Sequence, residues 1–157
     1  MKSEKDSFFK CVKILFTRLL SGHVHFSKKL VGKVLSMDDG KKFQVIRDLK
    51  VDAKTQSSKS TAVFILQFKF SGLPLAVNKI LSMFPAPFLI AKTDFLEKIW
   101  TVSEESYFQG IYQWSSEESA EKYPESFIFK IMSKRSAAGT LSYKIIPIHF
   151  CLIILRN

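Results

Sequence analysis

The sequence contains few of the residues that build disulfide frameworks and nucleophilic triads. Its 157 residues include two cysteines, Cys11 and Cys151, which lie near opposite ends of the chain. They form no CxxC pair, so free thiols in a reducing compartment are the favoured interpretation, with a disulfide between them left open. No Ser-His-Asp or Cys-His arrangement, Walker loop or GxGxxG is present. The common sequence signatures of hydrolases and nucleotide-binding proteins are therefore absent.

Histidines are equally scarce, which bears on metal binding. His23 and His25 are close in sequence, and His149 lies far from both. The close pair would need two more ligands to hold a metal ion, and the sequence shows no pattern that supplies them. No metal site is predicted.

Long apolar runs are also missing. The chain has no stretch of about 18 uninterrupted apolar residues, the length that a membrane-spanning helix needs. Near the N-terminus, Lys10, Lys13 and Arg18 interrupt the apolar segment that a secretory signal would require. We therefore predict a cytoplasmic protein without a transmembrane helix.

Apolar and basic side chains, by contrast, are abundant. Hydrophobic residues make up 46% of the chain and include 15 phenylalanines, enough for a packed core. The formal net charge is +10, with 13 basic and 6 acidic residues in 1–57 against 11 and 8 in 58–157. The polar stretch 52–60 separates the two parts. We predict a basic helical extension with a short strand over 1–57 and one compact domain over 58–157.

The basic extension shows helical periodicity over residues 1–36. One apolar face is formed by residues at helical spacing: Phe8, Val12, Leu15, Phe16 and Leu19. A second helix is predicted from about Phe26 with its apolar residues inward: Leu30, Val31, Val34 and Leu35. These helices either pack on the rest of the protein or lie on an anionic membrane surface through residues 8–35. Nucleic acid is not an expected partner, because the lysines are not interleaved with exposed-looking aromatics or phosphate-binding loops.

The sequence of the compact domain predicts an α+β fold with the order β-α-β-β-α-β, the ferredoxin-like arrangement. Alternating aromatic and β-branched residues indicate strands over 61–70 and 141–147 and a β-hairpin over 94–114. Helices are predicted over 74–83 and after Trp114. The short strand of the extension is predicted from Phe43 to about Lys50.

The hairpin is the most informative stretch of the sequence. In its first strand, the alternation predicts that Phe95 shares a face with Ile99, and that Lys98 and Trp100 share the other face. Gly110 interrupts the second strand. A missing side chain at such a position usually marks a bulge or a close neighbouring backbone.

Turn and cap residues set the expected ends of the helices. Pro85 and Pro87 are expected to end the first helix of the domain. Ser115 or Ser116 provides the N-cap of the second helix. Pro124 lacks an N–H and is expected to break that second helix, opening a further helical piece.

The hairpin and the helix after it carry a recognisable pattern: a strand with Lys-x-Trp-Thr, an acidic turn, a Gly-Ile-Tyr strand and an Ala-x-x-Tyr helix. The residues that form it are Lys98, Trp100, Thr101, Gly110, Ile111, Tyr112, Ala120 and Tyr123. Residues 60–147 therefore resemble a small mono-oxygenase family of dimeric α+β-barrel proteins, related to the antibiotic-biosynthesis monooxygenases. The resemblance implies a ferredoxin-like barrel half that pairs with a second copy in a homodimer.

The resemblance also implies a chemistry and a site. Related barrels oxidise aromatic polyketides without metal or flavin, and some relatives bind and degrade haem, which makes haem a candidate ligand. Trp100, Tyr112 and Trp114 are the candidate substrate-binding residues, and Tyr112 and His149 are the candidate catalytic residues. The Asn that the group uses on its first strand is absent here, where Gln67 is the only amide.

Two classes of function remain open at this point. One is a cofactor-independent monooxygenase-like enzyme acting on an aromatic or apolar small molecule in a barrel pocket. The alternative is a non-catalytic small-ligand-binding or accessory dimer, associated with a membrane surface through the basic residues. For Trp100 in particular, packing in the core is the ordinary role of an aromatic on a barrel strand.

Overall fold

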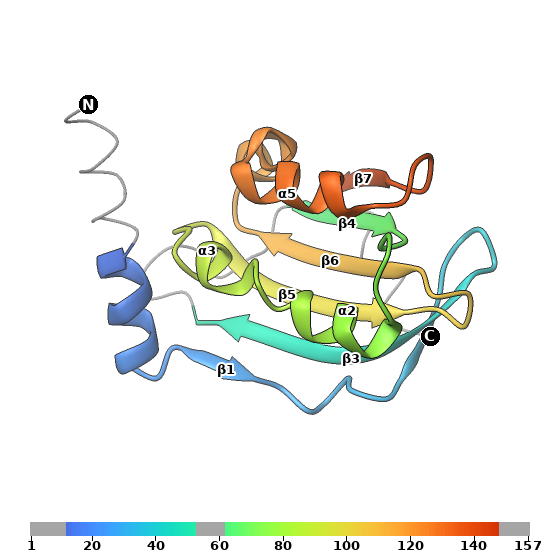
Figure 1. The fold of residues 1–157 in the computed structure, drawn as a ribbon. Coiled ribbons are helices and arrows are strands. Elements are labelled where there is room, and N and C mark those ends of the chain that lie inside the picture. Colours follow the sequence, from blue (N-terminus) through green and yellow to red (C-terminus); the bar gives the residue numbers. More distant parts are fainter. Residues whose placement is uncertain (1–11, 53–61, 148–157) are drawn as a thin grey trace.

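The computed structural model describes residues 12–52 and 62–147 and shows one antiparallel sheet with helices against one face (Figure 1). Cys11, Cys151, His149 and the predicted domain boundary at residue 57 lie outside the described residues. Within the described ranges, no helix has the length and apolar character needed to cross a membrane.

The sheet contains seven strands in the described parts of the chain. They are β1 Val24–Phe26, β2 Val34–Ser36, β3 Lys42–Val51, β4 Ala62–Phe68, β5 Phe95–Val102, β6 Phe108–Trp114 and β7 Ser142–Pro147. Their spatial order is β1-β3-β5-β6-β4-β7, and β2 also pairs with β3. The last four strands in sequence stand in the order β7-β4-β6-β5, which confirms the predicted ferredoxin-like fold.

The helices connect these strands and supply the outer layer. They are residues 12–20, α2 Leu75–Leu81, α3 Ala86–Ile90, α4 Glu117–Lys122 and α5 Phe127–Arg135, with a 3-10 turn η1 at Tyr123–Glu125. Buried side chains of α3, α4 and α5 join the same hydrophobic cluster as β4, β5 and β6. These helices therefore cover one face of the sheet.

The helix predicted from Phe26 is wrong. Its two ends lie in β1 and β2, with residues 27–33 in the connection between them, and pairing with β3 places Val24 opposite Val51 and Val34 opposite Gln44. A short helix is marginal on its own, whereas the free edge of the ten-residue β3 offers backbone partners to an extended segment. The described part of the first predicted helix, residues 12–20, is helical.

The predicted short strand of the extension is confirmed to within one residue at each end, as β3, and it belongs to the main sheet. β3 pairs with β5 from Gln44↔Val102 to Lys50↔Glu97, with a register shift between Val45 and Arg47. The basic extension therefore adds three strands, β1, β2 and β3, to the edge of the ferredoxin-like half, where the sequence predicted helices and one short strand.

The prolines after α2 act differently from the prediction. α2 ends at Leu81, and Pro85 then serves as the N-cap of a second helix, α3, whose first turn contains Pro87. Proline is tolerated there because the first N–H groups of a helix have no intrahelical partner. Pro85 and Pro87 thus begin a helix and do not end one.

The second helical region matches its sequence signals. The Ser116 hydroxyl accepts a hydrogen bond from the Ser119 N–H at 3.3 Å and caps α4. Pro124 lies in η1, after which Ser126 caps α5 by accepting from the Phe129 N–H at 3.2 Å. The predicted break at Pro124 is confirmed.

The hairpin is confirmed, but one face assignment in it is wrong. The β5–β6 ladder shifts register between Phe95 and Glu97. Phe95 consequently belongs to the cluster under the helices, with Trp100, while Ile99 belongs to the cluster on the opposite face. A bulge adds a residue to one strand and so reverses the alternation before it.

The face of the sheet away from the helices also carries apolar residues that are buried in the single chain. Val63, Ile65 and Ile99 expose 1%, 3% and 1% of their surface, and Phe43 exposes none. The predicted homodimer was expected to cover an open apolar sheet. This burial removes an uncovered apolar sheet face as the reason for the dimer, and the dimer itself stays a prediction.

Candidate functional site

The three aromatic candidates lie together on the helix-covered face of the sheet. Trp100 comes from β5, and Tyr112 and Trp114 come from β6. In the ladder Lys98 stands opposite Tyr112, and Trp100 stands opposite Gly110. All three aromatic side chains are buried, with at most 3% exposed.

Gly110 makes room for the ring of Tyr112. A Cβ atom at Gly110 would lie 2.6 Å from Cε2 and 2.8 Å from the hydroxyl of Tyr112. The ladder through Gly110 has no register shift, so neither a bulge nor a neighbouring backbone explains the glycine. The close neighbour is a side chain, which lies flat across the strand where other residues would carry a Cβ.

A small cavity adjoins two of the three aromatic residues. It has room for about one water molecule, about 10 Å³. Its lining residues come from β4, β5, β6, α5, the C-cap of α2 and the loop after β4: Phe68, Phe70, Ser82, Lys98, Trp100, Phe108, Gln109, Gly110, Tyr112 and Met132. Trp114 is not among them, and it packs against Phe95 and Tyr123 with ring centroids 5.6 and 5.7 Å apart.

Lys98 is the unusual member of this lining. Only 2% of the residue is exposed, and its Nζ lies 4.3 Å from the ring centroid of Trp100 and 4.7 Å from that of Tyr112. Among the described residues, no carboxylate oxygen comes within 4 Å of this Nζ. Burial lowers the pKa of Lys98 to about 7, because a charged amine loses its hydration there.

Sequence reasoning included Lys98 in the family pattern but assigned it no chemical role. A signal was available, because the alternation in β5 already placed Lys98 on the same face as Trp100. The sequence pattern could not show that no acidic side chain lies near Lys98, because that depends on residues from other elements.

The neighbours of Lys98 hold its two aromatic walls in place. The Trp100 indole donates from Nε1 to the Ser82 carbonyl at 2.9 Å. The Tyr112 ring packs against Phe64 and Tyr123, with centroids 5.9 and 5.0 Å away. Burial raises the pKa of Tyr112 to about 12, so its phenol keeps its proton at neutral pH. The phenol is therefore a weak acid that stays protonated, so it can donate a hydrogen bond but is not present as a base.

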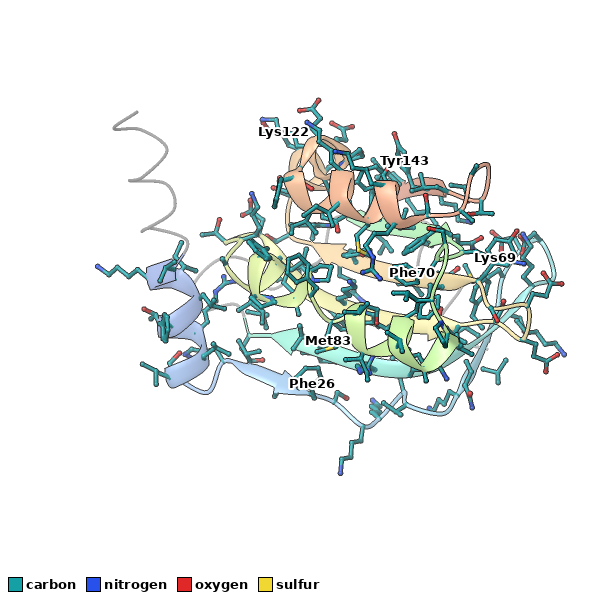
Figure 2. The ribbon with its side chains drawn as sticks, in the orientation of Figure 1. Phe26, Lys69, Phe70, Met83, Lys122 and Tyr143 are labelled. Carbon is teal, nitrogen blue, oxygen red and sulfur yellow. The ribbon has the colours of Figure 1, made fainter. Side chains whose placement is uncertain are left out.

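Three residues form a bridge between α2 and α5 beside the cavity. The Arg135 guanidinium lies over the Phe70 ring at 4.6 Å, and its Nη2 donates to Asn78 Oδ1 at 3.4 Å. Asn78 is itself fixed, since its Nδ2 donates to the Leu73 carbonyl at 2.7 Å. Phe70 lines the cavity and lies between the two helices in Figure 2.

The site does not fit haem or a metal ion. The cavity is far smaller than a porphyrin, and neither described histidine, His23 or His25, lines it. Throughout residues 12–52 and 62–147, no group of three or more His, Cys, Asp or Glu side chains is arranged to hold a metal ion. No chemical step is therefore derived through either group.

A second set of buried ionisable residues lies on the opposite face of the sheet. Asp48 of β3 is fully buried, and Glu97 of β5 is 9% exposed. Lys50 Nζ lies 3.0 Å from Glu97 Oε1 and 4.0 Å from Asp48 Oδ2. Burial, reinforced by the neighbouring Asp48, raises the pKa of Glu97 to about 7.

The chain was compared with known proteins at the level of sequence and of structure. No family model matches it, and no curated protein matches it either. Among solved structures, it is similar to a monooxygenase-like protein from Listeria innocua, with 10% identity and a TM-score of 0.51. That match covers 69% of this chain but only 65% of the Listeria protein.

Two further structures come from Listeria monocytogenes. A ferredoxin-fold protein related to antibiotic-biosynthesis monooxygenases has 10% identity and a TM-score of 0.51, covering 78% of this chain and 90% of its own. A heme-degrading enzyme has 12% identity and a TM-score of 0.49, covering 78% and 95%, a likeness too low to carry an argument. The first of these descriptions agrees with the family that the sequence resembles. At these identities, what the comparisons show is that the chain has the ferredoxin-like fold.

Proposed function

We propose that the protein is a cofactor-independent, monooxygenase-like enzyme acting on an aromatic or other apolar small molecule between the sheet and α2 and α5. The observation that carries the proposal is Lys98, whose buried amine stands between two aromatic rings at a cavity. The monooxygenase-like protein from Listeria innocua with a similar fold supports it.

Oxygenation without a cofactor requires an electron-rich substrate anion. A phenol or enol provides one when a base removes its proton, and a neutral amine with a pKa near 7 suits that task. The Lys98 ammonium formed in this way then stabilises the neighbouring oxyanion. Tyr112, a candidate catalytic residue from the sequence, stays protonated at neutral pH and is therefore not available as the base.

The overall reaction balances without an added reductant. The substrate anion reacts with O₂ at an activated CH₂ carbon, and loss of water leaves a carbonyl group there. One oxygen atom ends in the carbonyl and the other in water, and the substrate carbon supplies all four electrons. Trp100 and Tyr112 hold the planar substrate against Lys98 in this scheme.

Substrate entry requires the site to open. The cavity has room for about one water molecule, so an aromatic substrate needs α2 and α5 to separate. The long hydrogen bond from Arg135 to Asn78 is the polar contact to be broken, and the Phe70 side chain is the apolar one.

Oxygen uptake with a panel of phenols and anthrone-type enols tests the proposal. The protein is expected to accelerate uptake, and Lys98→Met is expected to lower the rate at least about 100-fold, the usual contribution of a positioned base. Lys69→Met is the matched control, because Lys69 lies 4.5 Å over the Tyr107 ring and outside the cavity. Uptake that survives Lys98→Met unchanged would reject Lys98 as the base.

The second candidate is a non-catalytic ligand-binding or accessory dimer. The near-complete burial of Trp100 and Tyr112 favours it, because core aromatics need no substrate. Native mass spectrometry separates the two, since a dimer with a bound small molecule and no oxygen uptake would support the second. The homodimer, the cytoplasmic location and membrane contact through residues 8–35 belong to these proposals. Native mass spectrometry tests the dimer, cell fractionation tests the location, and binding to vesicles tests the membrane contact.

A further inference from the structure

We propose that the outer surface of α2 and α3 docks on an anionic membrane surface, with its apolar side chains among the lipids and its lysines at the headgroups. This α2–α3 surface is formed by exposed apolar side chains: Leu75, Val77, Ile80, Leu81, Phe84 and Phe88. None of them lines the cavity beside Lys98 or belongs to residues 8–35. The inference therefore goes beyond the proposed oxygenation and does not depend on it.

The helix α2 has its polar side chains inward and its apolar side chains outward. Asn78 and the C-cap residue Ser82 are each 3% exposed, whereas Ile80 exposes 69% of its surface. Leu75 and Val77 expose 38% and 40%. The apolar stripe of an ordinary surface helix faces the core. The reversed orientation of α2 is matched to an apolar medium outside the chain.

Two side chains of the sheet hold α2 in this orientation. Arg47 of β3 donates from Nη1 to the Lys79 carbonyl at 2.7 Å. Trp100 of β5 donates from Nε1 to the Ser82 carbonyl at 2.9 Å. Turning the helix to bury Ile80 would break both hydrogen bonds, so the outward apolar side is a fixed property of the fold.

The apolar surface continues from α2 onto α3. Phe84 and Phe88 expose 51% and 43% of their surface, and their ring centroids are 5.7 Å apart. Figure 1 shows α2 and α3 following one another on the same side of the sheet. A contiguous exposed apolar surface marks an interaction site. Phenylalanine and leucine are among the side chains that interfacial helices place at the boundary of headgroups and acyl chains.

The charge of this stretch favours an anionic lipid surface over a second copy of the chain. Residues 71–93 contain two lysines, Lys79 and Lys92, and no aspartate or glutamate, in a chain of net charge +10. Two copies that met through this surface about a two-fold axis would bring the same lysines together, with no acid of the stretch to pair with them. An anionic bilayer supplies the negative charge, and lysine stems can lie along its apolar boundary.

Vesicle flotation of the full-length protein tests the proposal. The protein is expected to bind vesicles of phosphatidylcholine with phosphatidylglycerol, more weakly at higher salt, and to bind phosphatidylcholine alone much less. Ile80→Gln with Phe84→Gln should weaken binding at least about tenfold, because two exposed apolar side chains no longer enter the lipid. Lys79→Gln and Lys92→Gln should each weaken it about fivefold. Phe127→Gln, at a 67% exposed position of α5, is the matched control and should leave binding unchanged.

A tryptophan placed on the surface gives a direct readout. The emission of Ile80→Trp should shift to shorter wavelength when anionic vesicles are added, and that of Phe127→Trp should not. All these positions are exposed, except for the half-buried Lys79, and circular dichroism checks that each variant keeps the wild-type spectrum.

The possible outcomes are distinct. Binding that survives Ile80→Gln with Phe84→Gln but is lost when the basic residues of 8–35 are changed would overturn the proposal, as would equal binding to phosphatidylcholine alone. A dimer in native mass spectrometry that the same double variant dissociates, without vesicle binding, would assign the surface to a second copy instead. Vesicle binding without oxygen uptake would support the docking surface and count against the oxygenase, and uptake without binding would do the reverse.

Discussion

The two faces of the sheet bury ionisable groups in different surroundings. On the helix-covered face, Lys98 has two aromatic rings as neighbours and, within the described residues, no acid in contact. On the opposite face, Asp48 and Glu97 share the amine of Lys50. Burial moves the pKa of Lys98 down and that of Glu97 up, and both arrive at about 7.

The difference separates an ionisable group that has a cation beside it from one that has no opposite charge in contact within the described residues. Glu97 is compensated in part by Lys50, although a second buried carboxylate, Asp48, lies beside the same amine. Lys98 has no such compensation. Burying its amine therefore lowers the free energy of unfolding of the protein. Groups retained at such a cost are candidates for function.

The largest expected effect comes from replacing the uncompensated lysine. Lys98→Met should raise the free energy of unfolding by roughly 3–5 kcal/mol at pH 6, because the folded protein no longer has to bury or discharge an amine. In the wild type the unfolded chain binds the extra proton between pH 7 and 10.5, so stability rises with pH across that window.

Urea unfolding of both proteins at pH 6 and pH 10 checks this prediction. The gap between the Lys98→Met variant and the wild type should shrink towards zero at pH 10. A variant less stable than the wild type at pH 6 would show that contacts of the ammonium with the rings outweigh its desolvation.

A smaller loss is expected from filling the space under Tyr112. Gly110→Ala should destabilise the protein by about 2–3 kcal/mol, because the added Cβ would overlap the buried ring. The ring is enclosed by Phe64 and Tyr123, so it has little freedom to move away.

A double-mutant cycle supplies the control for Gly110. In a Tyr112→Leu background, Gly110→Ala should cost much less, since the clashing ring is absent. Equal losses in both backgrounds, measured by thermal and chemical unfolding, would mean that the strand and not the ring requires glycine.

The smallest effect concerns the compensated face. The folded-state pKa of Glu97 is raised, so its contribution to stability is fully present below pH 4.5 and is lost as pH rises through about 7. Glu97→Gln should therefore flatten that decline and raise stability at pH 8 by about 1–2 kcal/mol.

Glu105→Gln, at an exposed position of the β5–β6 loop, is the matched control for this measurement. A Glu97→Gln variant that is less stable than the wild type at pH 8 would show that the ion pair with Lys50 outweighs the burial of the carboxylate. The free-energy cost of burying Glu97 would then be smaller than its raised pKa indicates.

Much of the fold was open to prediction because its signals are local. Alternating residues identified β5 and β6, Ser116 marked the start of α4, and Pro124 marked its break. The bulge after Phe95 was not visible, because nothing in the residues around it distinguishes a shifted ladder from a regular one. The same holds for β1 and β2, whose backbone partners lie on β3.

The candidate site was predicted in part. Trp100 and Tyr112 do meet at one cavity, as adjacent strands required, whereas Trp114 packs away from it. The pairing of Asp48 with Glu97 brings together residues from β3 and β5, far apart in the sequence. No spacing in the chain could indicate it.

The sequence by itself did not indicate β1, β2 or α3, but it determined the β-α-β-β-α-β order of the compact domain, the Ser116 cap, and the face on which Lys98 lies. These depend on neighbours within a few residues. Only the tertiary structure decided that Lys98 is enclosed, because Ser82, Phe70 and Met132 from three other segments line the same cavity. Desolvation depends on everything packed around a group, so the pKa of Lys98, and with it the proposed chemistry, belongs to the assembled layers.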